Sequence, residues 1–171
     1  VFIQVIGTVQ GVGFRPFVYN LALKYDIKGW VNNDEKGVNI LLSSSEENIQ
    51  NFINELKSNP PILARIDSIN IEKITEIKEY KTYEIIQSES SKNKSTIISP
   101  DIAICDDCLN NIDDRANFRY SYSLTNCTNC GPRYSIIKTV PYDRINTSMA
   151  SFEFCKNCKD EYENPTNRRY H

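Results

Sequence analysis

The chain has 171 residues, of which 40% are hydrophobic and 25% are charged, and this composition predicts a folded protein of one or two small domains. A net charge of −2 without a long basic block argues against a nucleic-acid-binding surface. No apolar run approaches the length of a membrane span, and no signal peptide opens the sequence, so we expect a cytoplasmic protein.

The first predicted elements are a strand at residues 1–9, a glycine-containing turn, and a helix that begins at Arg15. Gly11 and Gly13 allow the positive φ angles that bring a backbone close to a ligand. The start of a helix offers unpaired N–H groups and a partial positive charge, and the arginine adds a guanidinium that can hold two phosphate oxygens. Pro16 suits the first helical position because it has no N–H. The combination predicts an anion-binding loop rather than a plain strand-to-helix turn.

The elements that follow alternate between strand and helix patterns. Apolar residues at helical spacing predict a first helix that ends near Gly29 and a second helix that opens with a capping box at Ser44 and stops at Asn59. Shorter runs have the period-two alternation of strands. The apolar helix positions are Val18, Leu21, Ala22 and Tyr25, then Ile49, Phe52, Ile53 and Leu56, and the strands are expected at residues 30–33, 38–43, 66–74 and 82–87.

The resulting order is βαββαβ with one extra strand. It predicts an α+β fold of the ferredoxin-like class, in which two helices cover one face of an antiparallel sheet. This domain would occupy residues 1–88. A polar, serine-rich stretch at residues 89–99 breaks both periodicities and is typical of a linker. The cysteine-rich remainder, residues 100–171, is therefore expected to form a separate small module.

All six cysteines occur in Cys-x-x-Cys pairs, and in a reducing compartment this pattern favours metal binding over disulfides. Cys105 and Cys108 are followed, after 18 residues, by Cys127 and Cys130, a spacing typical of a four-cysteine zinc site. The region is too small for a large apolar core, and zinc ligation can contribute on the order of 10 kcal/mol to folding. We expect structural zinc, because four thiolates leave no open coordination position.

A third pair, Cys155 and Cys158, belongs to an internal repeat in which the first pair is displaced by 50 residues. The same displacement places Ile112 on Tyr162, Asp113 on Glu163, Asn117 on Asn167, Arg119 on Arg169 and Tyr120 on Tyr170. We therefore expect the sequence to end inside a second zinc module. The alternative is a two-cysteine redox motif. His171 is either a third ligand or, as we expect, an exposed side chain.

The segment GTVQGVGFR at residues 7–15, followed by GWVNN at residues 29–33, resembles the acylphosphatase family, and the resemblance extends over residues 1–88. It implies the hydrolysis of carboxyl-phosphate anhydrides. It assigns phosphate binding to Arg15 and the positioning of the attacking water to Asn33. The phosphate cradle would be the backbone amides of Gln10, Gly11, Val12, Gly13 and Phe14.

The cysteine region is similar to the HypF family of carbamoyltransferases in the segments SPDIAICDDC, TNCTNCGPRY, PYDR and RRYH. That family joins an acylphosphatase domain and two zinc-finger modules to larger nucleotide-binding and transferase domains. The resemblance implies an N-terminal part of such an enzyme, with a complete finger at residues 105–130 and a truncated one from residue 155. It also implies release of carbamate and phosphate from carbamoyl phosphate, with ATP as a further substrate and HypE as the carbamoyl acceptor in [NiFe] hydrogenase maturation.

Two other functions stay open at this point. The first is a nucleic-acid-binding module, because RNA-recognition domains share the βαββαβ order and zinc ribbons often bind nucleic acid. The clusters Arg119-Tyr-Ser-Tyr and Arg168-Arg-Tyr would suit such a surface, but residues 38–43 lack the aromatic side chains that stack bases. The second is a zinc-stabilised binding scaffold without enzymatic activity.

Overall fold

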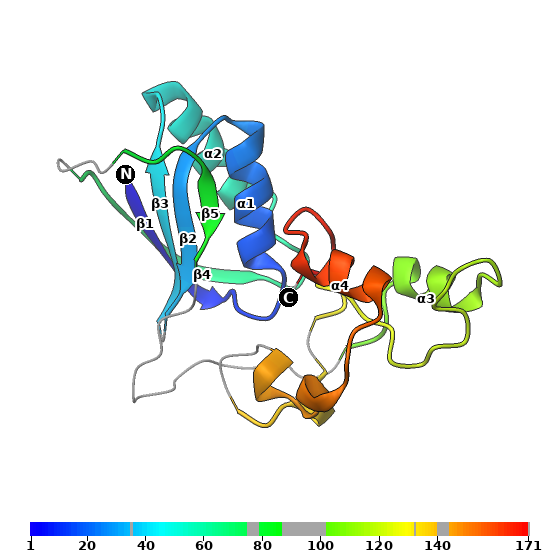
Figure 1. The fold of residues 1–171 in the computed structure, drawn as a ribbon. Coiled ribbons are helices and arrows are strands. Elements are labelled where there is room, and N and C mark those ends of the chain that lie inside the picture. Colours follow the sequence, from blue (N-terminus) through cyan, green and yellow to red (C-terminus); the bar gives the residue numbers. More distant parts are fainter. Residues whose placement is uncertain (35, 75–78, 87–101, 132, 140–143, 171) are drawn as a thin grey trace.

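The computed structural model describes residues 1–34, 36–74, 79–86, 102–131, 133–139 and 144–170. An N-terminal domain of strands and helices is followed by a cysteine region, residues 102–170, that consists of short helices and loops (Figure 1). The predicted linker at residues 89–99 and the candidate ligand His171 lie outside the described residues.

Five strands form one sheet in the order β4-β1-β3-β2-β5. Their bounds are β1 Phe2–Thr8, β2 Lys28–Asn33, β3 Gly37–Ser43, β4 Arg65–Glu72 and β5 Tyr83–Ile85. The first four strands pair antiparallel in the ferredoxin-like order, which confirms the predicted fold class. The extra strand, β5, makes the sheet differ from the fully antiparallel sheet that we predicted. Because β5 runs opposite to β4, it pairs parallel to β2 and makes the sheet mixed.

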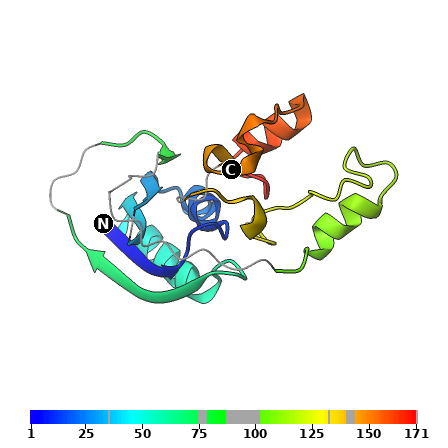
Figure 2. The same ribbon diagram turned by 90° about the horizontal axis from the view of Figure 1, so that it is seen from below.

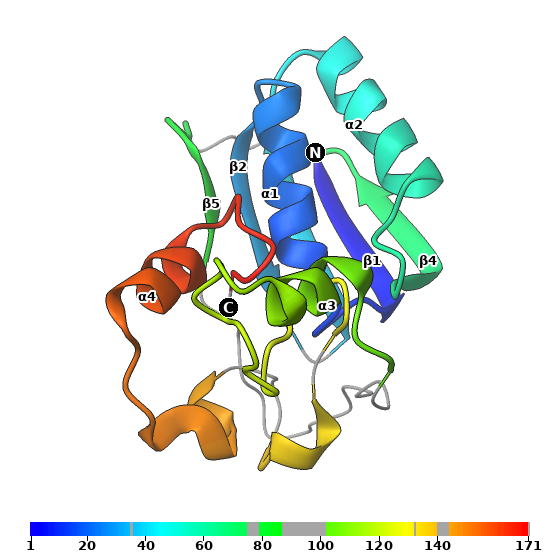
Figure 3. The same cartoon turned by 90° about the vertical axis from the view of Figure 1, so that its right-hand side faces the viewer.

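Helices α1 (Phe14–Lys24) and α2 (Glu46–Ser58) cover one face of this sheet (Figure 3). Their predicted apolar stripes form most of the contact with the strands, and burial of such side chains stabilises a domain by about 25 cal/mol per Å² of apolar surface. The buried stripe residues are Val18, Leu21 and Ala22 of α1 and Phe52, Ile53 and Leu56 of α2, which share one core with Ile3, Val5, Val31, Val38 and Ile40 of the sheet.

Helix α1 differs from the prediction at both ends. It begins at Phe14, so Pro16 is the third helical residue rather than the first. Proline is still tolerated there, because the N–H groups of the first helical turn have no partner within the helix. The helix ends at Lys24 and not near Gly29, because Asp26 adopts a φ of 46° and the chain then enters β2.

The cap of α2 lies one residue later than predicted. Ser45, not Ser44, is the N-cap, and its Oγ accepts a hydrogen bond from the backbone N–H of Asn48 at 3.3 Å. The Ser44 hydroxyl instead donates to the carbonyl of Asp26 at 3.2 Å and ties two connections of the domain together. The predicted capping box of Ser44 and Glu47 is therefore wrong by one residue, because the Ser44 hydroxyl is engaged by Asp26.

The two α-helices of the cysteine region confirm the predicted repeat. Helices α3 (Asp106–Asp113) and α4 (Lys156–Glu163) have 8 residues each, and each begins directly after the first cysteine of its pair (Figure 2, green and orange-red). Each is followed by the same turn, closed by backbone bonds from Asn117 to Asp114 and from Asn167 to Asn164. Between these helices, the described residues include three 3-10 turns, at Tyr134–Ile136, Arg144–Asn146 and Ser148–Ser151.

Equivalent arginines of the two repeats reach across to each other's cysteine pair. Arg119 of the first repeat donates to the Cys158 sulfur at 3.5 Å, and Arg169 of the second repeat donates to the Cys108 sulfur at 3.8 Å. The repeat places Arg119 on Arg169 and Cys108 on Cys158. Such reciprocal contacts are those of a two-fold arrangement, so the repeats pair as a pseudo-dimer within one chain.

Each arginine also finds a second partner at equivalent positions of the two helices. Arg119 pairs with Glu161 of α4, and Arg169 donates to Asn111 Oδ1 of α3 at 2.7 Å. Arg119 is 7% exposed as a residue. The arginines that would have suited a nucleic-acid surface are therefore engaged inside the cysteine region, and this observation removes the main support for that alternative.

Candidate functional site

The strand order brings the two parts of the predicted phosphate site to one edge of the sheet. Strands β1 and β2 both pair antiparallel with β3, so they run in the same direction. The residues after β1 form the glycine loop, residues 10–15, while Asn33 is the last residue of β2. Val38 of β3 lies between Asn33 and Val5 of β1 in the sheet, a separation of two strand spacings or about 10 Å.

The glycine loop has the backbone conformation that the sequence analysis expected. Gly11 and Gly13 have φ angles of 71° and 75°, and Gly13 is the N-cap of α1 without any side-chain cap. The N–H of Phe17 donates to the Gly13 carbonyl at 3.0 Å and closes the first helical turn. The N–H groups before Phe17 have no partner within the helix, so an anion bound to the loop would find donors and a favourable helix dipole there.

Three loop residues hold the loop in place through their side chains. Val12 and Phe14 are each 1% exposed and belong to the core. Gln10 is 9% exposed, and its amide donates to the carbonyls of Asp34 at 2.7 Å and Gly37 at 3.0 Å. The Gln10 side chain therefore fastens the glycine loop to the β2–β3 turn, directly beyond Asn33. Of the predicted cradle, these residues can offer only backbone N–H groups to an anion.

Asn33 carries a buried oxygen that lacks a hydrogen-bond donor. The residue is 4% exposed, and its Oδ1 has no hydrogen-bond partner among the described residues. Side chains alternate along a strand, so Asn33 shares the helix-covered face with the fully buried Val31. A buried amide oxygen is costly unless it accepts a hydrogen bond, and a water molecule or ligand at this edge would supply one. Asn32 has the same unsatisfied Oδ1, but on the opposite face.

Arg15 lies in the first turn of α1, next to the glycine loop, and is half-buried. The structure thus brings together the loop, the arginine and Asn33 at the same end of the domain. Their assigned roles in catalysis stay predictions.

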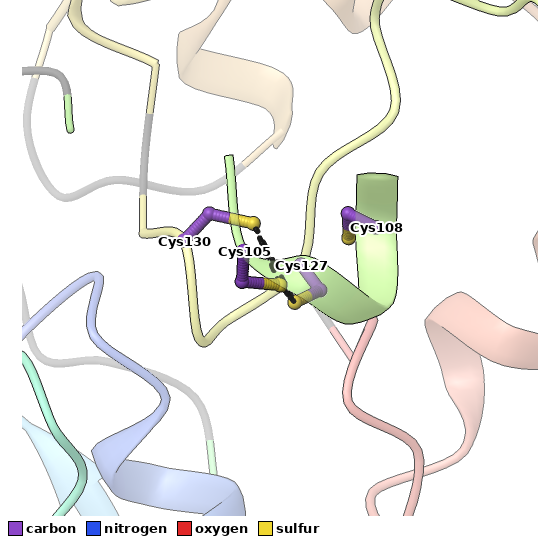
Figure 4. A group of neighbouring side chains, drawn as sticks. All are labelled: Cys105, Cys108, Cys127 and Cys130. Atoms are coloured by element: carbon purple, nitrogen blue, oxygen red, sulfur yellow. Dashed lines mark hydrogen bonds between the residues drawn. The ribbon is translucent and has the colours of Figure 1, made fainter. Parts of the chain in front are cut away.

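A second candidate site is the cysteine cluster formed by Cys105, Cys108, Cys127 and Cys130 (Figure 4). The four sulfur atoms lie within 4.8 Å of one another, and three of the separations are 3.4, 3.6 and 3.7 Å. A tetrahedral ion with Zn–S bonds of about 2.3 Å requires sulfur separations of about 3.8 Å. The set of donors therefore fits a four-thiolate metal site, as predicted from the spacing.

The thiols of this cluster have pKa values that are shifted in opposite directions by their surroundings. Burial raises the pKa of Cys108 to about 12 and also raises the pKa of Cys105. Burial acts in the same direction on Cys130, but hydrogen bonds from Cys105 and Cys127 outweigh it and lower the pKa of Cys130 to about 6. A metal ion must therefore displace protons from the cluster when it binds.

The third cysteine pair has no such cluster. Among the described residues, the four cysteines above are the single group of three or more close metal-ligating side chains, and Cys155 and Cys158 stand apart from it. Cys155 is exposed, and the N–H of Cys158 donates to its sulfur at 3.5 Å. The ligand role that we predicted for this pair stays untested. None of the helices within the described residues combines the length and the apolar sequence that a membrane span requires.

One contact between the two candidate sites was missed from the sequence. We call residues 127–131 the knuckle turn, and it lies against the glycine loop. A Cβ atom placed on Gly13 would lie 2.7 Å from Thr128 Cβ and 2.9 Å from Thr128 Oγ1. A Cβ on Gly131 would lie 2.9 Å from Leu63 Cδ1 and 3.9 Å from the Gly11 oxygen. No periodicity or spacing signals a contact between residues this far apart in the chain.

Comparison with known proteins matches both regions. Residues 1–85 match the acylphosphatase family model, and residues 104–137 and 154–171 match the HypF finger model. The "Probable carbamoyltransferase HypF" of Methanocaldococcus jannaschii is 50% identical over 145 residues, which are 84% of this chain and 19% of that protein. An acylphosphatase of Listeria monocytogenes is 41% identical over 85 residues, which are 49% of this chain and 91% of that protein.

Among solved structures, the crystal structure of full-length HypF in the phosphate- and nucleotide-bound form superposes with a TM-score of 0.90 at 46% identity. The match covers 99% of this chain and 22% of that protein. The chain therefore spans about a fifth of the length of these longer relatives.

Proposed function

Because the chain belongs to the HypF family, we propose that its acylphosphatase domain hydrolyses an acyl phosphate to a carboxylate and inorganic phosphate. Carbamoyl phosphate is the substrate that we favour, since the longer relatives are named carbamoyltransferases. The products would then be carbamate and phosphate.

The observation that carries this proposal is the conformation of the glycine loop. Two glycines with positive φ precede α1, and the first N–H groups of the helix have no intrahelical partner. These donors and the Arg15 guanidinium would hold the phosphoryl oxygens. Phosphoryl transfer depends chiefly on positioning and on stabilising charge, which is what such a loop supplies.

Asn33 would position the attacking water. Its buried Oδ1 needs a donor and would accept a hydrogen bond from the water. The water oxygen forms a bond to phosphorus while the bond from phosphorus to the acyl oxygen breaks, and the carboxylate leaves with that electron pair. The protons of the water pass to the phosphate and to solvent. A mixed anhydride is already reactive, so the step requires no strong base.

The cysteine cluster would hold zinc, whose role is to cross-link two segments of a small region and not to react. In the longer enzyme, we propose that the carbamate made here is activated with ATP and that the carbamoyl group is then passed to HypE. The HypF structure with bound phosphate and nucleotide supports the use of both groups by that protein. The adenylation and transfer steps require parts of the longer enzyme.

Turnover of acetyl phosphate by variants of the whole chain tests the two assignments separately. Arg15→Ala should abolish binding of inorganic phosphate, whereas Asn33→Ala should retain phosphate binding and lower kcat. Arg115→Ala, at an exposed position of the cysteine region, is the matched control and should behave as wild type. In H2(18)O the label should appear in phosphate. Label in acetate, or an Arg15→Ala variant with unchanged kcat and KM, would contradict the proposal.

A further inference from the structure

We propose that the knuckle turn is part of the acyl phosphate site, and that Thr128 is a positioning residue that holds the glycine loop in its binding conformation. The proposal rests on the proposed function and adds a residue of the cysteine region to it. It implies that metal binding by the cysteine cluster and phosphate binding by the loop are coupled.

The first step is the contact itself. Gly13 is the N-cap of α1, is left-handed, and has no side-chain cap of its own. The Thr128 side chain occupies the space where a Gly13 side chain would be. Gly131, from the same turn, lies close to the Gly11 carbonyl and to Leu63. One short turn therefore packs against Gly13 and lies near Gly11, and it restricts the movement of the loop backbone.

The second step is that Thr128 is itself held in place. Its backbone N–H and its hydroxyl both donate to the carbonyl of Arg168, at 2.9 and 3.0 Å. The Arg168 guanidinium donates to the Cys108 sulfur at 2.9 Å and to Asn111 Oδ1 at 2.7 Å. A continuous series of contacts thus runs from the glycine loop through Thr128 and Arg168 to the cysteine cluster.

The third step connects the knuckle turn to the metal. Thr128 lies between Cys127 and Cys130, which are 6% and 0% exposed. A metal held by both cysteines and by the start of α3 would fix the turn, because ligation would cross-link these segments. Ordering the turn in advance lowers the cost of ordering the loop when phosphate binds.

Acylphosphatases without a finger region lack this contact between a knuckle turn and the glycine loop. The Listeria acylphosphatase is matched over 91% of its length by 85 residues, so it has no room for a finger region of this kind. The acylphosphatase fold as such does not require the knuckle turn. The contact with Thr128 is therefore an addition in this chain, placed at the loop on which the reaction depends.

Binding of inorganic phosphate to the zinc-loaded chain tests the proposal, with amide hydrogen exchange of residues 11–15 as a second readout. Thr128→Gly removes the side chain that meets Gly13, and we expect phosphate affinity to fall by about fivefold or more and loop exchange to accelerate. Thr128→Val keeps a branched side chain at Gly13 but loses the hydroxyl bond to Arg168, so its phosphate affinity should lie between those of wild type and Thr128→Gly. Asn129→Gly gives the same backbone freedom at an exposed position of the turn and is the matched control.

Reciprocity provides a second test, which needs no variant of the knuckle turn. If the two sites are coupled, saturating phosphate must raise the zinc affinity of the wild-type chain, measured by equilibrium competition with a chromogenic chelator, and must not do so in Arg15→Ala. Equal zinc affinity with and without phosphate, or equal phosphate affinity in Thr128→Gly and wild type, would overturn the coupling. A wild-type chain that binds no phosphate would instead overturn the proposed function.

Discussion

The buried ion pair of Arg119 in the cysteine region allows a quantitative prediction of how much this arginine contributes to the free energy of unfolding. The Arg119 side chain is 9% exposed and its partner Glu161 is 22% exposed. Removing one member of a buried ion pair costs about 3–5 kcal/mol, because the other charge is left without compensation. Arg169 lies 3.7 Å from Glu161 and remains available to it. We therefore expect Arg119→Met, which keeps the apolar stem of the side chain, to cost about 2 kcal/mol, below that range.

Urea unfolding of the zinc-loaded chain, followed by far-UV circular dichroism, measures this loss. The chain has one tryptophan, Trp30 on β2, so tryptophan fluorescence reports the N-terminal domain separately and should be unchanged. Arg119→Met/Glu161→Leu removes both charges of this pair but leaves Arg169 without its carboxylate, so it should recover only part of the stability. If the free energy of unfolding of Arg119→Met lies within about 0.5 kcal/mol of the wild-type value, the reasoning is refuted, since that is the effect of an ordinary surface substitution.

Three further predictions concern pH, backbone geometry and metal. Hydrogen bonds from Lys24 and then Tyr25 lower the pKa of Glu55, so this carboxylate stabilises the fold above its ordinary pKa and the contribution is lost as the pH falls. Wild type should melt above Glu55→Gln at about pH 7, and the difference should shrink as the pH falls below about 4 in a thermal scan. Gly29→Ala should cost at least about 3 kcal/mol in urea unfolding, because the residue has a φ of 135° and a Cβ would lie 2.1 Å from the Leu41 carbonyl oxygen; a normal midpoint would contradict this. Chelation of zinc should increase amide exchange in α3 while β1 and β3 stay protected, and uniform protection throughout would argue against a metal-dependent cysteine region.

Local patterns predicted the elements and the fold class of the N-terminal domain. The helical spacing of Val18, Leu21 and Ala22 and the alternation in the strands each report which face is buried, and the order βαββαβ then allows few arrangements. The direction of β5 was not predictable in this way, since three residues, Tyr83–Ile85, carry too little pattern to select a neighbour. The cap at Ser45 rather than Ser44 depends on one hydrogen bond.

The same distinction between local patterns and tertiary contacts applies to the residues of the candidate sites. Chemistry carried by adjacent residues was visible, as in the glycine loop and the Cys-x-x-Cys pairs, because spacing alone places these groups together. Roles that arise only from tertiary contacts were not visible in the sequence. Gln10 was expected to act through its backbone alone, yet its side chain fastens the loop to the turn after Asn33. Thr128 gave no signal, since its importance comes entirely from its position against Gly13.

The most direct test of the account is phosphate release from carbamoyl phosphate by the zinc-loaded chain, measured beside Arg15→Ala and the control Arg115→Ala. The account predicts turnover in wild type and in the control, and none above the spontaneous rate in Arg15→Ala, with equal zinc content and an unchanged fold in all three. Absence of turnover in wild type, or equal turnover in Arg15→Ala, would contradict the claim that the glycine loop and Arg15 form an acyl phosphate hydrolysis site.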